Sequence, residues 1–251
     1  MRRTIIIGDL HGCHIEALEL LDKCQATTSD RVIFLGDLID RGADNDKCVD
    51  LSMKIEKEQG SKACILGNHE NKHISYRDRE ERGQPITIIS NEHVKTRAQL
   101  YKEHHDYFKT LPTFIRIPEH NVVCVHAGVW PNVKIEDQES RHLLHIQSIF
   151  NDPSDLSKKT KWPSKVLEHE TQWKFWTNFW TGPETIVFGH SVLDTPLISE
   201  YAIGIDGGAV FGRELWAYVL PNKEIVRVKS KTKVYDNRSK LYEVAPGVHT
   251  Y

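Results

Sequence analysis

The sequence lacks a long apolar run. No apolar run in its 251 residues approaches the length of roughly 20 consecutive residues that a transmembrane helix needs. The basic beginning is followed only by Ile5 to Ile7 before Asp9, which is too short for the apolar region of a signal peptide. We therefore expect a protein that makes no membrane contact and stays in the cytoplasm.

Cysteine is scarce and scattered. Five cysteines are an odd number, and no Cys-x-x-Cys pair occurs among them. This pattern disfavours a disulfide framework and a zinc knuckle, and it fits free thiols in a reducing compartment. The five are Cys13, Cys24, Cys48, Cys64 and Cys124.

An excess of charge of either sign is also missing. The chain has 33 Lys and Arg against 35 Asp and Glu, a net charge of −2. A protein that coats nucleic acid is usually basic, so that class is disfavoured, whereas a nucleotide held at one local site is not. With 39% apolar and 27% charged residues, the composition is that of a globular protein. No repeat or linker divides it, and we predict one domain over residues 1–251 with a variable aromatic-rich insert at about 151–183.

Short β-branched runs alternate with helical patterns early in the chain. We predict strands at residues 4–7, 31–35 and 63–66, and helices at 14–24 and 44–59. This alternation is typical of parallel strands joined by crossover helices, which indicates an α/β protein.

The remainder is less regular. The charged stretch 75–84 is predicted to be an exposed segment, and residues after about 233 a loosely held tail. Helices are expected at 94–109 and, short and aromatic, at 173–180. Expected strands are 114–117 and 122–126, which form a hairpin, and 185–188, 202–205, 214–220 and 224–228.

Polar side chains follow the predicted strands at the points where they end. The first three strands run into Gly-Asp-Leu-His-Gly, Gly-Asp-Leu-Ile-Asp-Arg-Gly and Gly-Asn-His-Glu, and two later strands run into His126 and His190. Ligands of open α/β sheets bind at the carboxyl ends of the strands. The glycines permit sharp turns there, so we expect these side chains to converge.

Carboxylate, imidazole and amide donors in one place suit a pair of divalent transition metals. Asp37 can bridge two cations with its two oxygens, and Asp9 and His11 alternate so that both can point the same way. Two metals about 3.5–4 Å apart can hold a bridging hydroxide and clamp a phosphoryl group for in-line attack. The predicted metal ligands are Asp9, His11, Asp37, Asn68, His126 and His190.

Three residues beside these ligands suit phosphoryl transfer. Arg41 can form paired hydrogen bonds to phosphate oxygens. His69 can protonate the leaving oxygen, and Asp40 can orient His69 and keep it cationic. The histidines outside these segments, including His73 and His93, are interpreted as surface or packing residues.

The strand-end segments resemble, in order, the motifs of the calcineurin-like metallophosphoesterases, more narrowly the branch with phosphoprotein phosphatases and bis(5′-nucleosyl)-tetraphosphatases. The motifs GDLHG, GDLIDRG, GNHE, VHAGV and FGHS span Gly8 to Ser191. The resemblance implies a four-layer fold, a β-sandwich of two mixed sheets flanked by helices. It also implies two manganese ions, with iron or zinc as alternatives. The implied roles are Asp9, His11 and Asp37 on the first metal, Asp37, Asn68, His126 and His190 on the second, His69 with Asp40 as general acid pair, and Arg41 on phosphate.

One segment departs from the family's pattern. Related enzymes often carry Leu-Leu-Trp-Ile-Arg, whose Arg is a second phosphate clamp, where this chain has Leu143 to Gln147. Gln147 supplies no charge, and the loss of a charged hydrogen bond costs on the order of 1.5–3 kcal/mol. Either Arg141 compensates for the positive charge that is missing at Gln147, or no residue does. The candidate substrate-binding residues are Arg41, Asn68 and Arg141.

The first hypothesis for function is hydrolysis of nucleotidic substrates such as dinucleoside tetraphosphates. An aromatic group near the insert can stack on a base or form the small core of a lid, and Lys158, Lys159 and Lys161 can attract polyphosphate. The alternatives are a protein serine/threonine phosphatase, an RNA-end phosphatase and a non-catalytic metal-binding scaffold. The aromatic group is Trp162, Trp173, Phe175, Trp176, Phe179 and Trp180.

Overall fold

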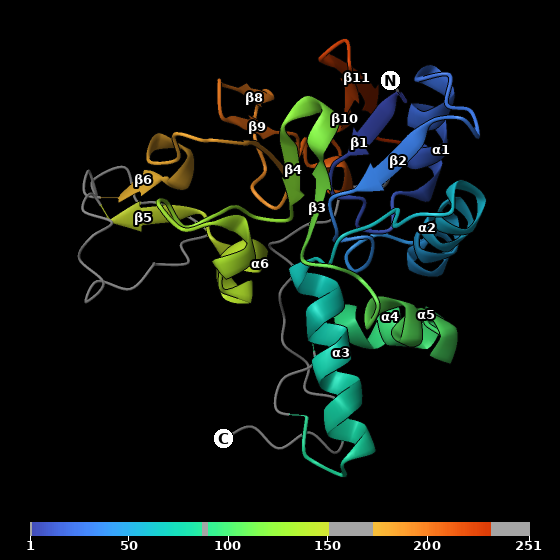
Figure 1. Ribbon diagram of the computed structural model, residues 1–251. Helices are drawn as coiled ribbons and strands as arrows, with labels where there is room; N and C mark the ends of the chain where they lie inside the picture. The colour runs from blue at the N-terminus through green and yellow to red at the C-terminus, as the bar shows by residue number, and fades with distance from the viewer. Residues whose placement is uncertain (1, 87–89, 151–172, 232–251) are drawn as a thin grey trace.

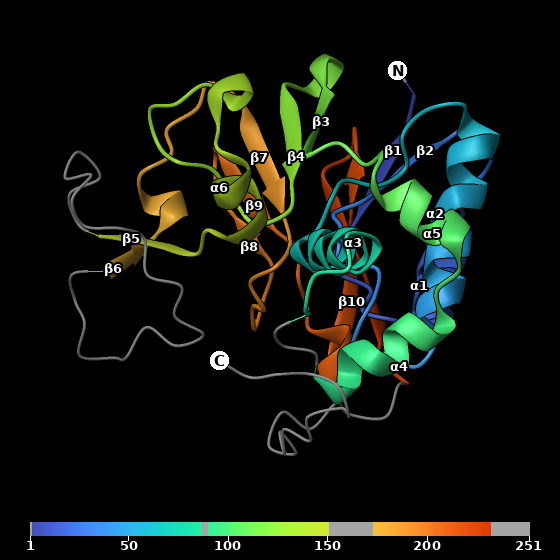
Figure 2. The same ribbon diagram turned by 90° about the horizontal axis from the view of Figure 1, so that it is seen from below.

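Two mixed β-sheets pack face to face in the computed structural model, which describes residues 2–86, 90–150 and 173–231 (Figures 1 and 2). Parallel and antiparallel pairs occur in both sheets, so the predicted sandwich of two mixed sheets is confirmed. The first sheet has the order β11 (Glu224–Lys229), β10 (Glu214–Leu220), β1 (Thr4–Ile7) and β2 (Arg31–Phe34). The second has the order β3 (Phe114–Ile117), β4 (Val122–Val125), β7 (Thr185–Phe188), β9 (Ala202–Gly204) and β8 (Leu197–Ile198).

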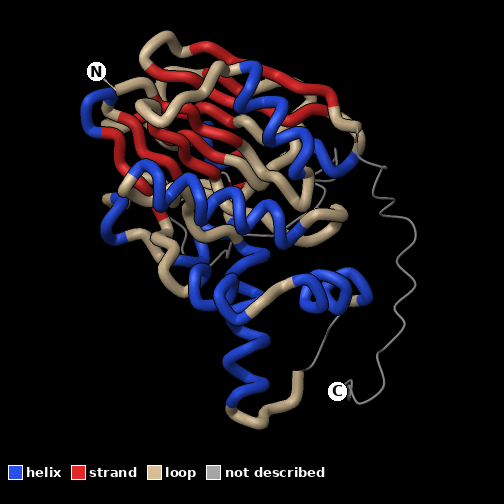
Figure 3. The backbone as a smooth tube through the Cα atoms, turned by 90° about the vertical axis from the view of Figure 1, so that its right-hand side faces the viewer, coloured by secondary structure: helices blue, strands red, loops and turns tan. Residues whose placement is uncertain are grey.

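Helices cover the outer faces of the sheets, and one group extends away from them. Helices α1 and α2 lie against the first sheet and α6 lies on the side of the second (Figure 2). Helix α3 projects from the sandwich, with α4 and α5 beside it (Figures 1 and 3). The bounds are α1 (His14–Lys23), α2 (Asn45–Gln59), α3 (Asn68–Glu81), α4 (Asn91–Gln99), α5 (Lys102–Phe108) and α6 (Ser140–His145).

The alternation of side chains along the central strands creates the layers. Ile6 of β1 and Cys124 of β4 lie in the core between the two sheets. Ile7, one position on, packs in the core beneath α1 and α2, and Val125 packs in a third core on the outer face of the second sheet. Successive side chains of a strand point to opposite faces, so strands this apolar must be covered on both sides.

Local structure differs from the sequence predictions at several places. Residues 63–66 are not a strand: Cys64 forms a single bridge with Phe34, at which the N–H of Ile65 donates to the Phe34 carbonyl at 3.1 Å. The N–H of Leu66 donates instead to the carbonyl of Pro112. The charged stretch 75–84 is exposed or partly exposed, as predicted, but most of it belongs to α3, whose exposed face carries the i,i+4 ion pair Arg77–Glu81 at 3.0 Å. The predicted helix 94–109 is divided into α4 and α5.

The aromatic segment after the insert is also different from the prediction. Instead of a helix over 173–180, β6 (Trp173–Phe175) pairs with β5 (Ser148–Phe150), and a short 3₁₀ turn follows at Trp176–Asn178. Residues 151–172 and the predicted tail after 233 lie outside the described residues, and so do Trp162 and the three lysines of the insert.

Trp176 is a core residue of the outer layer. Its side chain is fully buried, its ring centroid lies 5.0 Å from that of Phe188, and Gly128 approaches so closely that a Cβ there would lie 2.5 Å from Trp176 Cε2. Trp180 is buried in the same core, where Phe175 and Phe179 pack. Base stacking is therefore wrong for Trp176 and Trp180, and packing is confirmed for them.

Trp176→Ala is expected to lower the free energy of unfolding by about 3–5 kcal/mol, because it leaves a cavity beneath Phe188. Equilibrium denaturant unfolding measures this loss. Trp130→Ala is the matched control, since Trp130 is only partly buried. A loss below about 1 kcal/mol for Trp176→Ala would contradict its place in the core.

Candidate metal centre

The loops that follow the central strands of both sheets meet at one edge of the sandwich. Strands β1 and β2 are parallel neighbours, and the N–H of His11 donates to the carbonyl of Asp37 at 2.8 Å. Strands β4 and β7 are likewise parallel, and the N–H of Gly189 donates to the carbonyl of His126 at 2.8 Å. The two sheets are joined where the N–H of His190 donates to the Asp9 carboxylate at 3.1 Å.

Backbone strain concentrates at this edge. Nine non-glycine residues in the described part of the chain have a positive φ, and five of them belong to these loops. Such a conformation costs on the order of 1–3 kcal/mol at a non-glycine residue and persists where the surrounding structure imposes it, often at functional sites. The five are His11, Asp37, Asp40, Arg41 and His190, with φ of 46°, 48°, 72°, 71° and 62°.

Glycine is required where the loops touch. Gly36 has φ of +85°, and a Cβ there would lie 2.7 Å from Gly67 Cα. A Cβ on Gly189 would overlap the carboxylate of Asp9. These two positions let the polar side chains of four loops come together.

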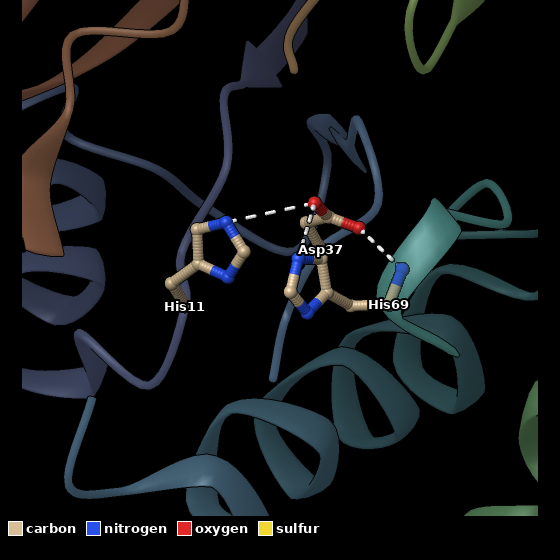
Figure 4. Close-up of side chains that lie close together, drawn as sticks. All are labelled: His11, Asp37 and His69. Carbon is tan, nitrogen blue, oxygen red and sulfur yellow. Dashed lines mark hydrogen bonds and ion pairs between the residues drawn. The ribbon is translucent and has the colours of Figure 1, made fainter. Parts of the chain in front are cut away.

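Asp37 is surrounded by imidazoles. Its Oδ2 lies 3.4 Å from His126 Nε2 and 3.5 Å from His11 Nε2, while Oδ1 accepts the backbone N–H of His69 at 3.0 Å. Figure 4 shows His11, Asp37 and His69 arriving from separate segments. Burial alone would raise the pKa of Asp37, but the imidazoles of His126, His69 and His11 outweigh burial and hold it well below its ordinary value. The carboxylate is therefore anionic.

Backbone carbonyls orient the imidazoles of His11 and His126. His11 Nδ1 lies 2.8 Å from the carbonyl of Ile39, and His126 Nδ1 lies 2.7 Å from the carbonyl of Leu35. A carbonyl only accepts, so each Nδ1 carries a proton and each Nε2 faces the site. Metal-binding histidines are typically held in this way.

His11 Nε2 faces the Arg41 guanidinium with its lone pair. His126 Nε2 faces the oxygens of Asn68 and Asp37. Burial would lower the pKa of His126, but the charge of Asp37 raises it to about 10, so a bound metal would replace a proton there.

Asn68 and Asp9 complete the cluster. Asn68 Oδ1 lies 2.8 Å from His126 Nε2 and 2.9 Å from His190 Nδ1. Burial and the neighbouring Asp206 raise the pKa of Asp9, so a cation among these buried carboxylates would offset their repulsion. The structure thus brings the six predicted ligands together, and their oxygen and nitrogen donors fit divalent metal ions.

His69, Asp40 and Arg41 lie beside the cluster. His69 Nδ1 donates to Asp40 Oδ2 at 2.6 Å, and Arg41 Nη2 lies 3.1 Å from His69 Nε2. Arg41 also contacts His11, and its guanidinium lies 5.5 Å from the ring centre of Phe211. Burial would raise the pKa of Asp40, but the hydrogen bonds from His69 and His73 hold it well below its ordinary value.

Glu70 holds two loops of the site together, and the sequence patterns had not predicted a role for it. Its fully buried carboxylate accepts the N–H groups of Asp37 at 2.9 Å, Leu38 at 2.8 Å and Gly67 at 3.1 Å. Burial and nearby Asp37 raise the pKa of Glu70 to about 7. Its position directly after His69 in the Gly-Asn-His-Glu segment is the signal that marks it.

The segment 143–147 and the nearby Arg141 contribute no residue to the six-residue cluster. Arg141 is exposed on α6 and pairs with Glu139 at 2.8 Å, so it is not brought to the cluster. The carbonyl of Gln147 accepts the N–H of Trp176 at 3.0 Å. From the same segment His145 approaches the cluster, its ring centroid 6.4 Å from that of His190.

Comparison with known proteins agrees with this geometry. The pattern of the family described as calcineurin-like phosphoesterase matches residues 2–225. The chain belongs to the calcineurin-like phosphoesterase family. As a member of that family it is a hydrolase of phosphate esters that uses divalent metal ions. Separately, none of its described helices is long and apolar enough to cross a membrane.

Relatives of this phosphoesterase share most of its length. It is 29% identical over 241 residues to the bis(5′-nucleosyl)-tetraphosphatase PrpE [asymmetrical] of Oceanobacillus iheyensis, covering 90% of this chain and 92% of the relative. The protein of the same name from Bacillus velezensis is 29% identical over 250 residues, with 90% and 92% coverage. A crystal structure of a candidate diadenosine tetraphosphatase superposes with a TM-score of 0.74 and 27% identity over 91% of this chain and 94% of that one.

Proposed function

We propose that this phosphoesterase hydrolyses dinucleoside tetraphosphates with two divalent metal ions, manganese being the expected metal. The observation that carries the chemistry is the buried cluster around Asp37, with His69 and Asp40 at its side. The substrate is supported by the relatives named bis(5′-nucleosyl)-tetraphosphatase, which match this chain over nearly their whole length.

Each residue of the cluster has a distinct part in the proposed reaction. The six clustered ligands would hold the metals, which supply Lewis acidity and an activated water when bound. Arg41 would bind a phosphate oxygen together with Asn68. His69, held at Nδ1 by Asp40, presents Nε2 toward the cluster and would pass a proton to the leaving oxygen.

The alternatives use the same chemistry on other substrates. A protein serine/threonine phosphatase or an RNA-end phosphatase would need the same cluster, but the similar relatives carry a different name. A non-catalytic scaffold is disfavoured, because metal binding alone has no use for the His69–Asp40 pair. The five cysteines are buried and none is in a disulfide, which supports the proposed reducing, cytoplasmic setting.

Parallel assays of the manganese-loaded protein test this proposal. We expect kcat/KM for diadenosine tetraphosphate to exceed that for a phosphopeptide by about tenfold or more, because the nucleotide ends add binding energy that the reaction can use. A chelator should abolish both activities. A preference for the phosphopeptide would favour the protein phosphatase. Bound metal without turnover of either would favour the scaffold and direct attention to Gln147.

A further inference from the structure

The carboxylate of Asp40 is shared by more than one histidine. It is fully buried, and while Oδ2 accepts from His69, Oδ1 lies 2.9 Å from Nε2 of His73. His73 is on α3, one turn after His69, and is itself buried. Residues four apart lie on the same face of a helix, so both imidazoles reach the same carboxylate.

A third histidine approaches from another helix. His93, in the first turn of α4, places Nε2 3.5 Å from Asp40 Oδ2. Ser90 caps α4 by accepting the N–H of His93, and its Oγ lies 2.9 Å from His93 Nδ1. The cap therefore orients the His93 ring toward Asp40. Asp40 lies among His69, His73 and His93 in the described structure.

We infer that His73 is a positioning residue: its hydrogen bond to Oδ1 holds the Asp40 carboxylate in the orientation that directs His69 at the leaving group, and His93 supports it. The inference rests on the proposed phosphoester hydrolysis. A carboxylate held at both oxygens cannot rotate about its terminal torsion, and this fixes the direction of its hydrogen bond to His69.

Packing alone is a poor explanation for His73. Its Nδ1 is buried without a hydrogen-bond partner among the described residues. Leaving a buried polar atom unpartnered costs on the order of 1–3 kcal/mol, which an apolar side chain of similar size would avoid. The histidine is thus placed there at a cost to stability, and the hydrogen bond that its side chain makes within the described structure leads to Asp40.

The decisive measurement compares two leaving groups in the manganese-loaded enzyme. Phenyl phosphate releases a phenol about as weakly acidic as tyrosine, with a pKa of about 10, and needs protonation. The nitrophenol of p-nitrophenyl phosphate is far more acidic and needs little help. We expect His73→Leu to lower kcat for phenyl phosphate by about 10- to 100-fold and for p-nitrophenyl phosphate by less than about threefold. His73→Gln places an N–H near the position of Nε2 and should restore kcat to within about threefold of wild type.

His104→Leu is the matched control. His104 is also buried and also contacts an aspartate, Asp50, at 3.0 Å, but has no contact with Asp40 among the described residues. It should affect the two substrates equally. Equal losses on both substrates in His73→Leu, or failure of the glutamine to restore kcat, would overturn the inference. Metal content, measured in each variant, should match wild type.

A second readout does not depend on activity. The short His69–Asp40 hydrogen bond should give a downfield ¹H resonance of His69 Nδ1–H in ¹⁵N-histidine NMR. The resonance should move upfield or broaden in His73→Leu and persist in His73→Gln and His104→Leu. An unchanged resonance in His73→Leu would overturn the inference. Lack of activity on the dinucleotide by wild type would reject only the proposed substrate.

Discussion

Replacing His69 with asparagine is expected to lower kcat by about 10²- to 10⁴-fold while the protein keeps its metal, because general acid catalysis contributes about that much. Asparagine can still donate to Asp40 Oδ2, 2.6 Å from the present Nδ1, but it has no second nitrogen to direct at the leaving oxygen. Steady-state kinetics with phenyl phosphate, whose leaving group needs protonation, and elemental analysis of the same preparation measure the two quantities.

His142→Asn serves as the control for this experiment. His142 is buried and stacks on Trp130 with ring centroids 5.1 Å apart, away from Asp40 and Asp37. It should leave kcat within about threefold of wild type, since it loses packing only. If kcat were unchanged in His69→Asn, His69 would have no part in the chemistry.

Asp37→Asn is expected to remove at least one of two bound metal ions and most of the activity. The anionic Oδ2 faces the nitrogens of His126 and His11, and an amide would place either a neutral oxygen or an N–H₂ donor there. Metals of this class bind best to anionic oxygen together with imidazole. Elemental analysis after dialysis against metal-free buffer gives the ions bound per chain.

The control for this variant is another buried aspartate. Asp30 is buried and pairs with Arg3 at 2.7 Å near the beginning of the chain, outside the cluster. Asp30→Asn should lower stability slightly and leave the metal content at the wild-type value. Two full equivalents of metal in Asp37→Asn would show that Asp37 does not bridge the pair.

The chemistry of this site could be predicted from sequence because it is encoded locally. Strands β1, β2 and β7 are short apolar runs followed by glycine and then by a predicted ligand, which is Asp9, Asp37 or His190, and His126 directly follows the apolar strand β4. Glycine allows the turn, and the parallel pairs β1–β2 and β4–β7 bring their carboxyl ends to one edge. Residue type, order and strand direction together determine the six clustered donors.

Other features followed from contacts between distant segments. His73 and His93 have the local pattern of ordinary helical residues, yet α3 and α4 place both against Asp40. Trp176 has the sequence character of a base-stacking residue, but Gly128 and Phe188 enclose it. The run around Cys64 is as apolar as a strand, and pairing beside β2 ends there after a single bridge.

There is a physical reason why some features could be predicted from the sequence and others only from the tertiary structure. The sequence by itself determined which donors follow which strands, because turn chemistry and strand periodicity act over a few residues. Tertiary structure alone decided which histidines surround Asp40 and which tryptophans are buried, because burial and side-chain pairing depend on contacts between segments that are distant in the sequence.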